Sequence, residues 1–254
     1  MDLLNQLRGL KLFEGVPAEK LQMLAERARY RSYRAGEMFI GETDAIHAFY
    51  VVISGQIKLY KSSLEGKEQT LYLLRPGDPF GMCTAFAIDT FPANATALEE
   101  SVVLLIPGQA MEAVAMKEPR LLVNIIQILS DRLKESMSLI ESLSLKEIPE
   151  RLASFLLHDL AMQTGEEIAR RESAREQLPR DVPRGKRARA EGLDPRKDLQ
   201  LTITQRELAK ILGSTPEALS RAIRKMTNAG ILVVDGRSIR IVDREALAEL
   251  AEGE

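Results

Sequence analysis

The chain has 254 residues, of which 45% are hydrophobic and 28% are charged. This length suits two packed domains, and the apolar content excludes wholesale disorder. Lys and Arg number 35 and Asp and Glu number 37, which gives a formal net charge of −2, so a basic surface for nucleic acid has to be local.

Cysteine and histidine are scarce. A single cysteine, Cys83, excludes an internal disulfide framework, a four-cysteine zinc site and a cysteine-ligated iron–sulfur cluster within one chain. Two histidines exclude a His-rich metal site. No apolar run reaches the roughly 18 residues of a membrane span, and the N-terminus lacks a signal-peptide core. We therefore expect a soluble, cytoplasmic protein with no membrane partner.

The first hundred residues change from helical to strand patterns. Leucines at helical spacing predict short helices over residues 1–30. From about Tyr33 to Pro107, short β-rich runs alternate with glycine-containing breaks such as Ser54–Gly55 and Glu65–Gly66. Many short strands at this spacing predict a sandwich or barrel rather than a βαβ sheet.

A long helix is predicted over residues 119–145. Its apolar positions advance in alternating steps of four and three, which gives a narrow seam formed by Leu122, Ile126, Leu129, Leu133, Ser136, Ile140 and Leu143. Such a seam favours a helix–helix dimer contact, because a helix that packs on its own domain usually has a broader apolar stripe. An intrachain core helix is the alternative. Pro149 then opens another helix.

Residues 165–198 form a charged insertion with ten basic and eight acidic residues. Glu–Arg pairs four residues apart allow a solvated helix to about Gln177, and prolines and glycines then predict an exposed loop. The favoured interpretation is a solvated linker. A nucleic-acid contact through the basic stretch 184–189 is the alternative.

Residues 202–226 have the pattern of a helix-turn-helix. Thr204 caps a first helix with Glu207 three residues later, and Gly213 supplies the turn. Thr215 caps a second helix that begins at Pro216. The second helix has an apolar face and an outward face, the latter formed by Glu217, Ser220, Arg221 and Arg224.

Charge and a following hairpin favour DNA binding over a plain packing unit. Residues 199–242 hold seven basic and three acidic groups, a balance of +4. The stretch after the second helix alternates around Asp235–Gly236, as expected of a wing. Arg221 is placed to give two hydrogen bonds to guanine and Glu217 to accept one from cytosine. Gln205, Thr215 and the amides of the second helix's first turn are placed for phosphates.

The order of these features resembles the cyclic-AMP receptor/fumarate–nitrate regulator (CRP/FNR) family of bacterial transcription factors over nearly the whole chain. The resemblance rests on Ala35–Gly36–Glu37, on the runs 49–55 and 74–78, on the long helix and on the winged helix-turn-helix. It implies an α+β fold: an N-terminal β-roll, a jelly roll of the cyclic-nucleotide-binding type, in 1–116; a dimerisation helix in 117–145; and a C-terminal winged helix-turn-helix in 146–254. It also implies a homodimer on an inverted DNA repeat, with RNA polymerase as a partner.

Within the family, the second helix resembles the E-x-x-S-R pattern at Glu217, Ser220 and Arg221. That pattern is associated with TTGA-type half-sites in the branch that responds to oxygen and nitric oxide. The resemblance therefore implies a TTGA-type inverted repeat.

The effector of the family's cyclic-AMP branch is not expected here. Those members have F-G-E followed by an R-S or R-T pair, whereas this chain reads Phe80–Gly81–Met82 and has Asn94–Ala95–Thr96 in the second region. Without these ionic partners a buried phosphate would be costly, so cyclic AMP is rejected. The sequence predicts an apolar pocket formed by Phe80, Gly81, Met82, Cys83, Phe86, Phe91 and Asn94.

Haem sensing of nitric oxide is the leading effector hypothesis, because the family has haem-containing members. Iron needs axial ligands such as His, Met or Cys. The candidates are His47, His158, Met82 and Cys83, and each also has a plain structural interpretation. In that interpretation His47 lies in a loop and His158 packs against neighbouring helices. Met82 fills the interior of the roll, and Cys83 is a small buried hydrophobic residue.

Two other classes of function stay open, whereas a third does not. One is a regulatory module that acts on a protein partner, and another is a regulator whose pocket is filled by its own side chains. The third, an enzyme, is not expected, because the sequence has no Ser/His/Asp set, phosphate loop or carboxylate cluster with catalytic spacing.

Overall fold

The computed structural model describes residues 3–86, 90–176, 198–201, 203–236 and 238–253. The chain forms two compact units, residues 1–140 and 141–254. The predicted loop of the charged insertion lies outside the described residues over 177–197. Within the described residues, no helix is both long and apolar enough to cross a membrane.

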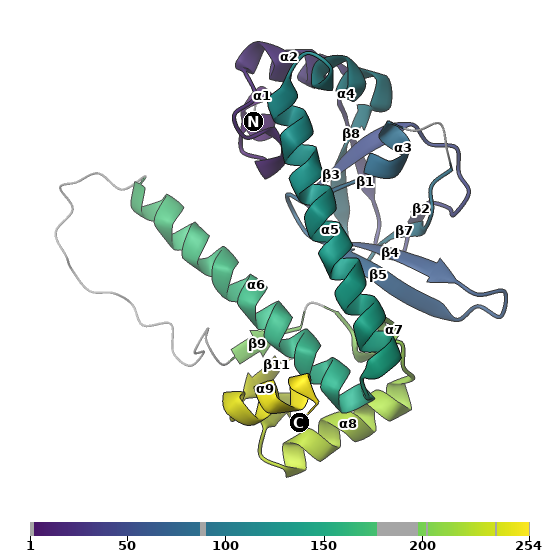
Figure 1. Cartoon of the computed structure of the whole chain (residues 1–254), viewed down its shortest axis with the longest axis vertical. Helices are drawn as coiled ribbons and strands as arrows, with labels where there is room; N and C mark the ends of the chain where they lie inside the picture. Colours follow the sequence, from purple (N-terminus) through teal and green to yellow (C-terminus); the bar gives the residue numbers. More distant parts are fainter. Residues whose placement is uncertain (1–2, 87–89, 177–197, 202, 237, 254) are drawn as a thin grey trace. The chain divides into compact units, whose positions relative to one another are not determined.

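The first unit contains two four-stranded antiparallel sheets (Figure 1). One has the order β1-β8-β3-β6, with β1 (Arg29–Tyr33), β3 (Ala48–Ser54), β6 (Pro79–Phe80) and β8 (Ser101–Pro107). The other has the order β2-β7-β4-β5, with β2 (Met38–Ile40), β4 (Ile57–Ser62), β5 (Glu68–Leu74) and β7 (Asn94–Ala97). These two sheets agree with the sandwich or barrel that the short, glycine-separated runs predicted, and with the β-roll that the family resemblance implied.

Strand β3 shows why these runs are so continuously apolar. Phe49 and Val51 pack into a core with the helices, whereas Tyr50 and Val52 pack into a second core inside the roll. Since alternate side chains point to opposite faces, both faces of the strand are buried and both have to be apolar.

Short helices cover the outer face of the first sheet (Figure 1). They are α1 (Leu3–Arg8), the 3-10 turn η1 (Lys11–Phe13), α2 (Ala18–Arg27) and α4 (Gly108–Ala115). A further short helix, α3 (Met82–Ala85), follows β6. The long helix α5 (Pro119–Leu145) begins in this core, where Leu121 and Ile125 are buried. The Asn124 amide donates to the carbonyls of Leu12 and Glu14, each at 2.9 Å, and fixes this end of α5.

The second unit is a winged helix-turn-helix. Helix α6 (Ile148–Glu176) packs against α8 (Pro216–Asn228) and α9 (Arg244–Glu252), and α7 (Gln205–Ile211) packs against α8. The sheet has the order β10-β11-β9, with β9 (Asp198–Gln200), β10 (Leu232–Asp235) and β11 (Ser238–Ile241). The predicted hairpin around Gly236 is therefore present, and α6 extends to Glu176, in agreement with the predicted helical extension.

Three strands were not predicted. Strand β1 has an exposed, polar pattern, β6 has two residues, and β9 has three. Their sequences carry too little alternation to be recognised, and their pairing to β8, β3 and β11 defines them instead.

Candidate nucleic-acid interface and ligand cavity

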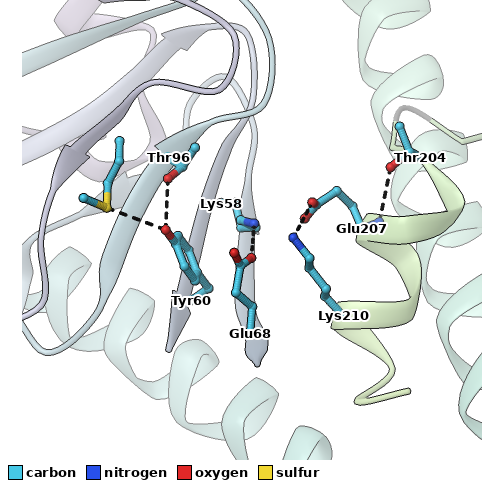
Figure 2. A network of polar contacts seen from close by, with 8 residues as sticks. Lys58, Tyr60, Glu68, Thr96, Thr204, Glu207 and Lys210 are labelled. Carbon is cyan, nitrogen blue, oxygen red and sulfur yellow. Dashed lines mark hydrogen bonds and ion pairs between the residues drawn. The ribbon is translucent and has the colours of Figure 1, made fainter. Parts of the chain in front are cut away.

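Both helices of the helix-turn-helix begin at the predicted caps. The Glu207 amide donates to the Thr204 hydroxyl at 3.2 Å, and the Ala218 amide donates to the Thr215 hydroxyl at 3.3 Å. Figure 2 shows the Thr204 cap and the ion pair in which Lys210 Nζ lies 2.9 Å from a Glu207 carboxylate oxygen. The caps fix where α7 and α8 start, so the side chains of their first turns have a defined direction.

Helix α8 has one buried and one exposed face. Leu219, Ala222 and Met226 are buried. The predicted base-reading and phosphate-contacting side chains are all exposed, namely Gln205, Thr215, Glu217, Ser220, Arg221 and Arg224. A capped helix with its apolar face buried and its polar first turns exposed is the form that enters a major groove.

The carboxylate of Glu217 is held in its ionised form. The pKa of Glu217 is lowered, mainly by the hydrogen bond from its own backbone amide, then by the Thr215 hydroxyl and by the positive charge of Arg221. At neutral pH this side chain is therefore an acceptor, which is what contact with a cytosine amine requires.

A basic hollow lies beside α8 within the second unit. It has a volume of about 520 Å³ and lies between α8 and the residues that open α6. Arg221 and Lys225 line it, and both are exposed. Lys225 was not among the predicted contacts; it is the next basic residue on α8 after Arg224, and its proximity to Arg221 places it for a phosphate.

Arg151 joins the start of α6 to the helix-turn-helix. Its Nε donates to the Lys146 carbonyl at 2.8 Å, Nη2 to Leu143 at 2.9 Å and Nη1 to Leu212 at 3.0 Å. Leu143 lies in the last turn of α5, and Leu212 ends α7. One side chain therefore positions the α5–α6 corner and the turn before α8 relative to each other.

The predicted dimer seam on α5 is exposed in the single chain. Ile126, Leu133 and Ile140 are 60%, 62% and 64% exposed. Leu122 and Leu129 are exposed as well, as is Met137, whereas Leu143 is half-buried. Leu121, Asn124 and Ile125 pack into the core with the N-terminal helices from another face of α5, so this core does not account for the exposed seam. Two seam residues also face the roll, since Leu129 borders it and the Ser136 hydroxyl contacts the Tyr72 hydroxyl of β5.

A cavity of about 310 Å³ lies in the first unit between the roll and α5. Its lining includes five of the seven predicted pocket residues, Phe80, Gly81, Met82, Cys83 and Phe91. The other lining residues are Leu59, Lys61, Leu71, Tyr72, Leu74, Pro79, Pro92, Ala93, Leu129 and Arg132. The described side chains leave this space unfilled.

Gly81 allows the cavity wall to turn. Its φ is +80°, a region that side-chain-bearing residues avoid, and a Cβ there would lie 2.6 Å from the Ala48 carbonyl oxygen. Phe80 stacks on Tyr50 with ring centroids 4.9 Å apart. Burial raises the pKa of the Tyr50 hydroxyl to about 12.

Two predicted pocket residues are misplaced. Phe86 is exposed and is not part of the cavity lining. Asn94 is also outside the lining, and its side-chain oxygen accepts a hydrogen bond from the Glu42 amide at 2.9 Å. Phe86 lies just beyond α3, and Asn94 opens β7, so neither position could be told from sequence alone.

The cavity also contains cations that the sequence analysis missed. Lys61 comes from β4 and Arg132 from α5. Arg132 lies outside the segment in which the family places its arginine, so no motif pointed to it. The cavity therefore does not lack a cation, contrary to the premise on which cyclic AMP was rejected, and none of the described lining residues is a carboxylate that could hold a ribose hydroxyl.

The four candidate haem ligands do not come together. Met82 and Cys83 line the cavity, and Cys83 is exposed rather than buried as predicted. His47 directly precedes β3 as predicted, and its Nδ1 lies 3.3 Å from the Thr84 carbonyl oxygen. His158 belongs to the second unit and is exposed, so it is not the packing residue that was predicted.

The cavity fits a haem poorly. Its volume of about 310 Å³ lies at the lower end of the range of roughly 300–1,000 Å³ for small-molecule sites, so it suits a ligand smaller than a haem.

A β-roll with a ligand cavity and a winged helix-turn-helix with an exposed recognition helix together define a DNA-binding transcription regulator with an effector-binding domain. Family models agree with both parts. Residues 30–118 match the cyclic nucleotide-binding domain, and residues 150–250 match the Crp-like helix-turn-helix domain. The chain belongs to the CRP/FNR family of regulators.

Relatives cover most of the chain. The anaerobic regulatory protein of Pasteurella multocida is 30% identical over 88% of this chain and 72% of its own length. The fumarate and nitrate reduction regulatory protein of Vibrio cholerae is 30% identical over 92% of this chain and 82% of its own length. The structure of FixK2 from Bradyrhizobium japonicum, 24% identical, covers 88% of this chain and 96% of that chain with a TM-score of 0.68, which shows a common fold.

Proposed function

We propose that this protein is a cytoplasmic homodimer that binds an inverted repeat of TTGA-type half-sites and regulates transcription, with RNA polymerase as its partner, in response to a small effector. The observation that carries the proposal is the capped helix α8, whose polar face is exposed at Glu217, Ser220 and Arg221. The names of the two curated relatives favour target genes of anaerobic metabolism.

Base reading is expected from Arg221 and Glu217, because they lie one helical turn apart on the exposed face of α8. An arginine fork matches guanine, and an ionised glutamate matches a cytosine amine. Lys225 and Arg224 are expected to neutralise phosphates, which position the protein but carry no sequence information.

Gel shifts on a TTGA inverted repeat and on a scrambled duplex test this assignment. Arg221→Ala is expected to cost about 1–3 kcal/mol on the repeat and little on the scrambled duplex, so discrimination falls. Lys225→Ala is the matched control on the same helix, and it is expected to weaken both complexes equally and to reduce the salt slope. Undiminished discrimination by Arg221→Ala would refute the proposed readout.

The homodimer is supported by the exposed seam on α5. Soluble monomers rarely expose a continuous apolar stripe, and the steps of four and three match the spacing of two helices packed along each other. Two recognition helices related by a two-fold axis would then read the two half-sites of a palindrome.

The effector is expected to act through α5. Leu129 lines the cavity and also belongs to the exposed seam. A ligand in the cavity therefore contacts the same side chain that a second copy would contact. If the ligand binds one dimer arrangement more tightly than another, it shifts the equilibrium toward that arrangement.

Haem-based sensing of nitric oxide stands second. Met82 and Cys83 offer an axial ligand at the cavity wall, but the cavity volume suits a molecule smaller than a haem. Absorption spectra of the protein with added haem, with and without nitric oxide, decide between haem and a smaller effector. A Soret shift together with a change in DNA binding would support haem, and the absence of both would exclude it.

A further inference from the structure

The cavity of the first unit combines an apolar lining with two cations. Among the fifteen lining residues that the structure describes, Lys61 and Arg132 carry positive charge and none is a carboxylate. Most of the others are aliphatic or aromatic, including Leu59, Leu74 and Phe80. Such a lining suits a molecule with a hydrocarbon body and one acidic group.

Arg132 is the better placed of the two cations. Its side chain is 20% exposed, against 46% for Lys61, so a charge beside it is screened less by water. Lys61 pairs with Glu42, and Arg132 Nη1 donates to a Glu135 carboxylate oxygen at 2.9 Å. Neither glutamate lines the cavity.

The Arg132 guanidinium is held in position by Tyr72 of β5. It lies over the Tyr72 ring at 4.7 Å from the ring centre, and the Tyr72 hydroxyl donates to the Arg132 carbonyl at 3.1 Å. The Glu135 contact uses one of the five N–H donors of the guanidinium. The planar fork matches the two oxygens of a carboxylate.

The volume limits the ligand further. A cavity of about 310 Å³ lies at the lower end of the range of roughly 300–1,000 Å³ in which proteins bind small molecules. It has room for a molecule of the size of phenylacetate or octanoate.

We propose that the effector is a small apolar carboxylic acid, aromatic or of medium chain length, whose carboxylate pairs with Arg132 while its hydrocarbon part lies against Phe80 and the leucines of β4 and β5. This inference rests on the proposed function only in calling the ligand an effector. The ligand is ionised at neutral pH, so the ion pair forms without a proton transfer. Its anchor lies on α5, the helix that carries the exposed seam.

Calorimetric titration and thermal unfolding of the full-length protein test the proposal. The probes are octanoate and phenylacetate, each compared with its amide, which has the same size and shape but no charge. The acids are expected to bind and raise the melting temperature, and the amides to bind at least about tenfold more weakly.

Variants locate the charge that binds the acid. Arg132→Gln is expected to weaken the binding of both acids about tenfold or more and to leave the binding of the amides unchanged. Lys134→Gln is the matched control, since Lys134 is exposed on the same helix and pairs with Asp131 at 3.3 Å. It is expected to bind both acids like the wild type. Ala93→Leu, which narrows the cavity, is expected to weaken acids and amides alike.

The proposal is wrong if neither acid binds, if the amides bind as tightly as the acids, or if folded Arg132→Gln binds the acids normally. A gel shift on the TTGA repeat is run in parallel. DNA binding without acid binding refutes only the ligand class, whereas acid binding without recognition of the repeat refutes only the proposed DNA function.

Discussion

The exposed seam of α5 predicts a dimer whose strength depends on individual leucines. Leu133 is 62% exposed in the single chain although it lies in the middle of the helix. Covering a leucine completely is worth about 1.5–3 kcal/mol, so covering the exposed part of Leu133 is worth about 1–2 kcal/mol in each copy. Because a two-fold dimer contains the residue twice, Leu133→Ala should weaken dimerisation by about 2 kcal/mol or more, roughly thirtyfold in Kd.

Sedimentation velocity over a concentration series measures this change. Leu64→Ala is the matched control. Leu64 is fully exposed between β4 and β5, so the substitution removes the same atoms at a position away from α5. The melting temperature of the monomer should hardly change in either variant, since both side chains are exposed in the single chain.

Equal dimerisation of the two variants would contradict the reasoning. It would mean that α5 presents its apolar side to something other than a second copy. The same series should show that Leu133→Ala loses affinity for an inverted repeat more than for a single half-site, because only the repeat engages both copies.

Other predictions concern single residues. Arg151→Ala should lower the stability of the second unit by about 3 kcal/mol in urea unfolding, because three carbonyls lose a charged donor; a change below about 0.5 kcal/mol would show that water replaces the side chain without cost. Gly81→Ala should destabilise the first unit by at least about 1–3 kcal/mol, since both the positive φ and the Ala48 carbonyl oppose a Cβ; full stability would disprove that constraint. Tyr50 should titrate near pH 12 by ultraviolet absorption. Because burial raises its pKa from 10, the stability that the hydroxyl contributes should be present below pH 10 and lost as the pH rises to about 12. A Tyr50→Phe variant that keeps the same pH dependence of stability would refute the assignment.

Local chemistry predicted much of this protein. The caps at Thr204 and Thr215, the start of α8 at Pro216 and the hairpin at Gly236 all lie where the sequence placed them. Each depends on neighbouring residues, through a hydroxyl that accepts an amide hydrogen or a backbone angle that glycine allows. The exposed side of α8 follows from helical periodicity in the same way.

The ligand cavity was predicted less well, because its wall comes from segments far apart in the chain. Phe80 and Met82 were identified from one motif, but Lys61 and Arg132 come from different elements and share no motif with it. Phe86 is near the cavity in sequence and yet exposed. Sequence proximity therefore selected the wrong neighbours for this site.

The sequence by itself determined the order of the elements, the capped recognition helix and the apolar seam of α5, because each is set by residues within a few turns of one another. Only the tertiary structure decided that Arg132 of the long helix lies over Tyr72 of β5 and lines an apolar cavity. The physical reason is that a cavity's charge and volume are sums over side chains that only folding brings together.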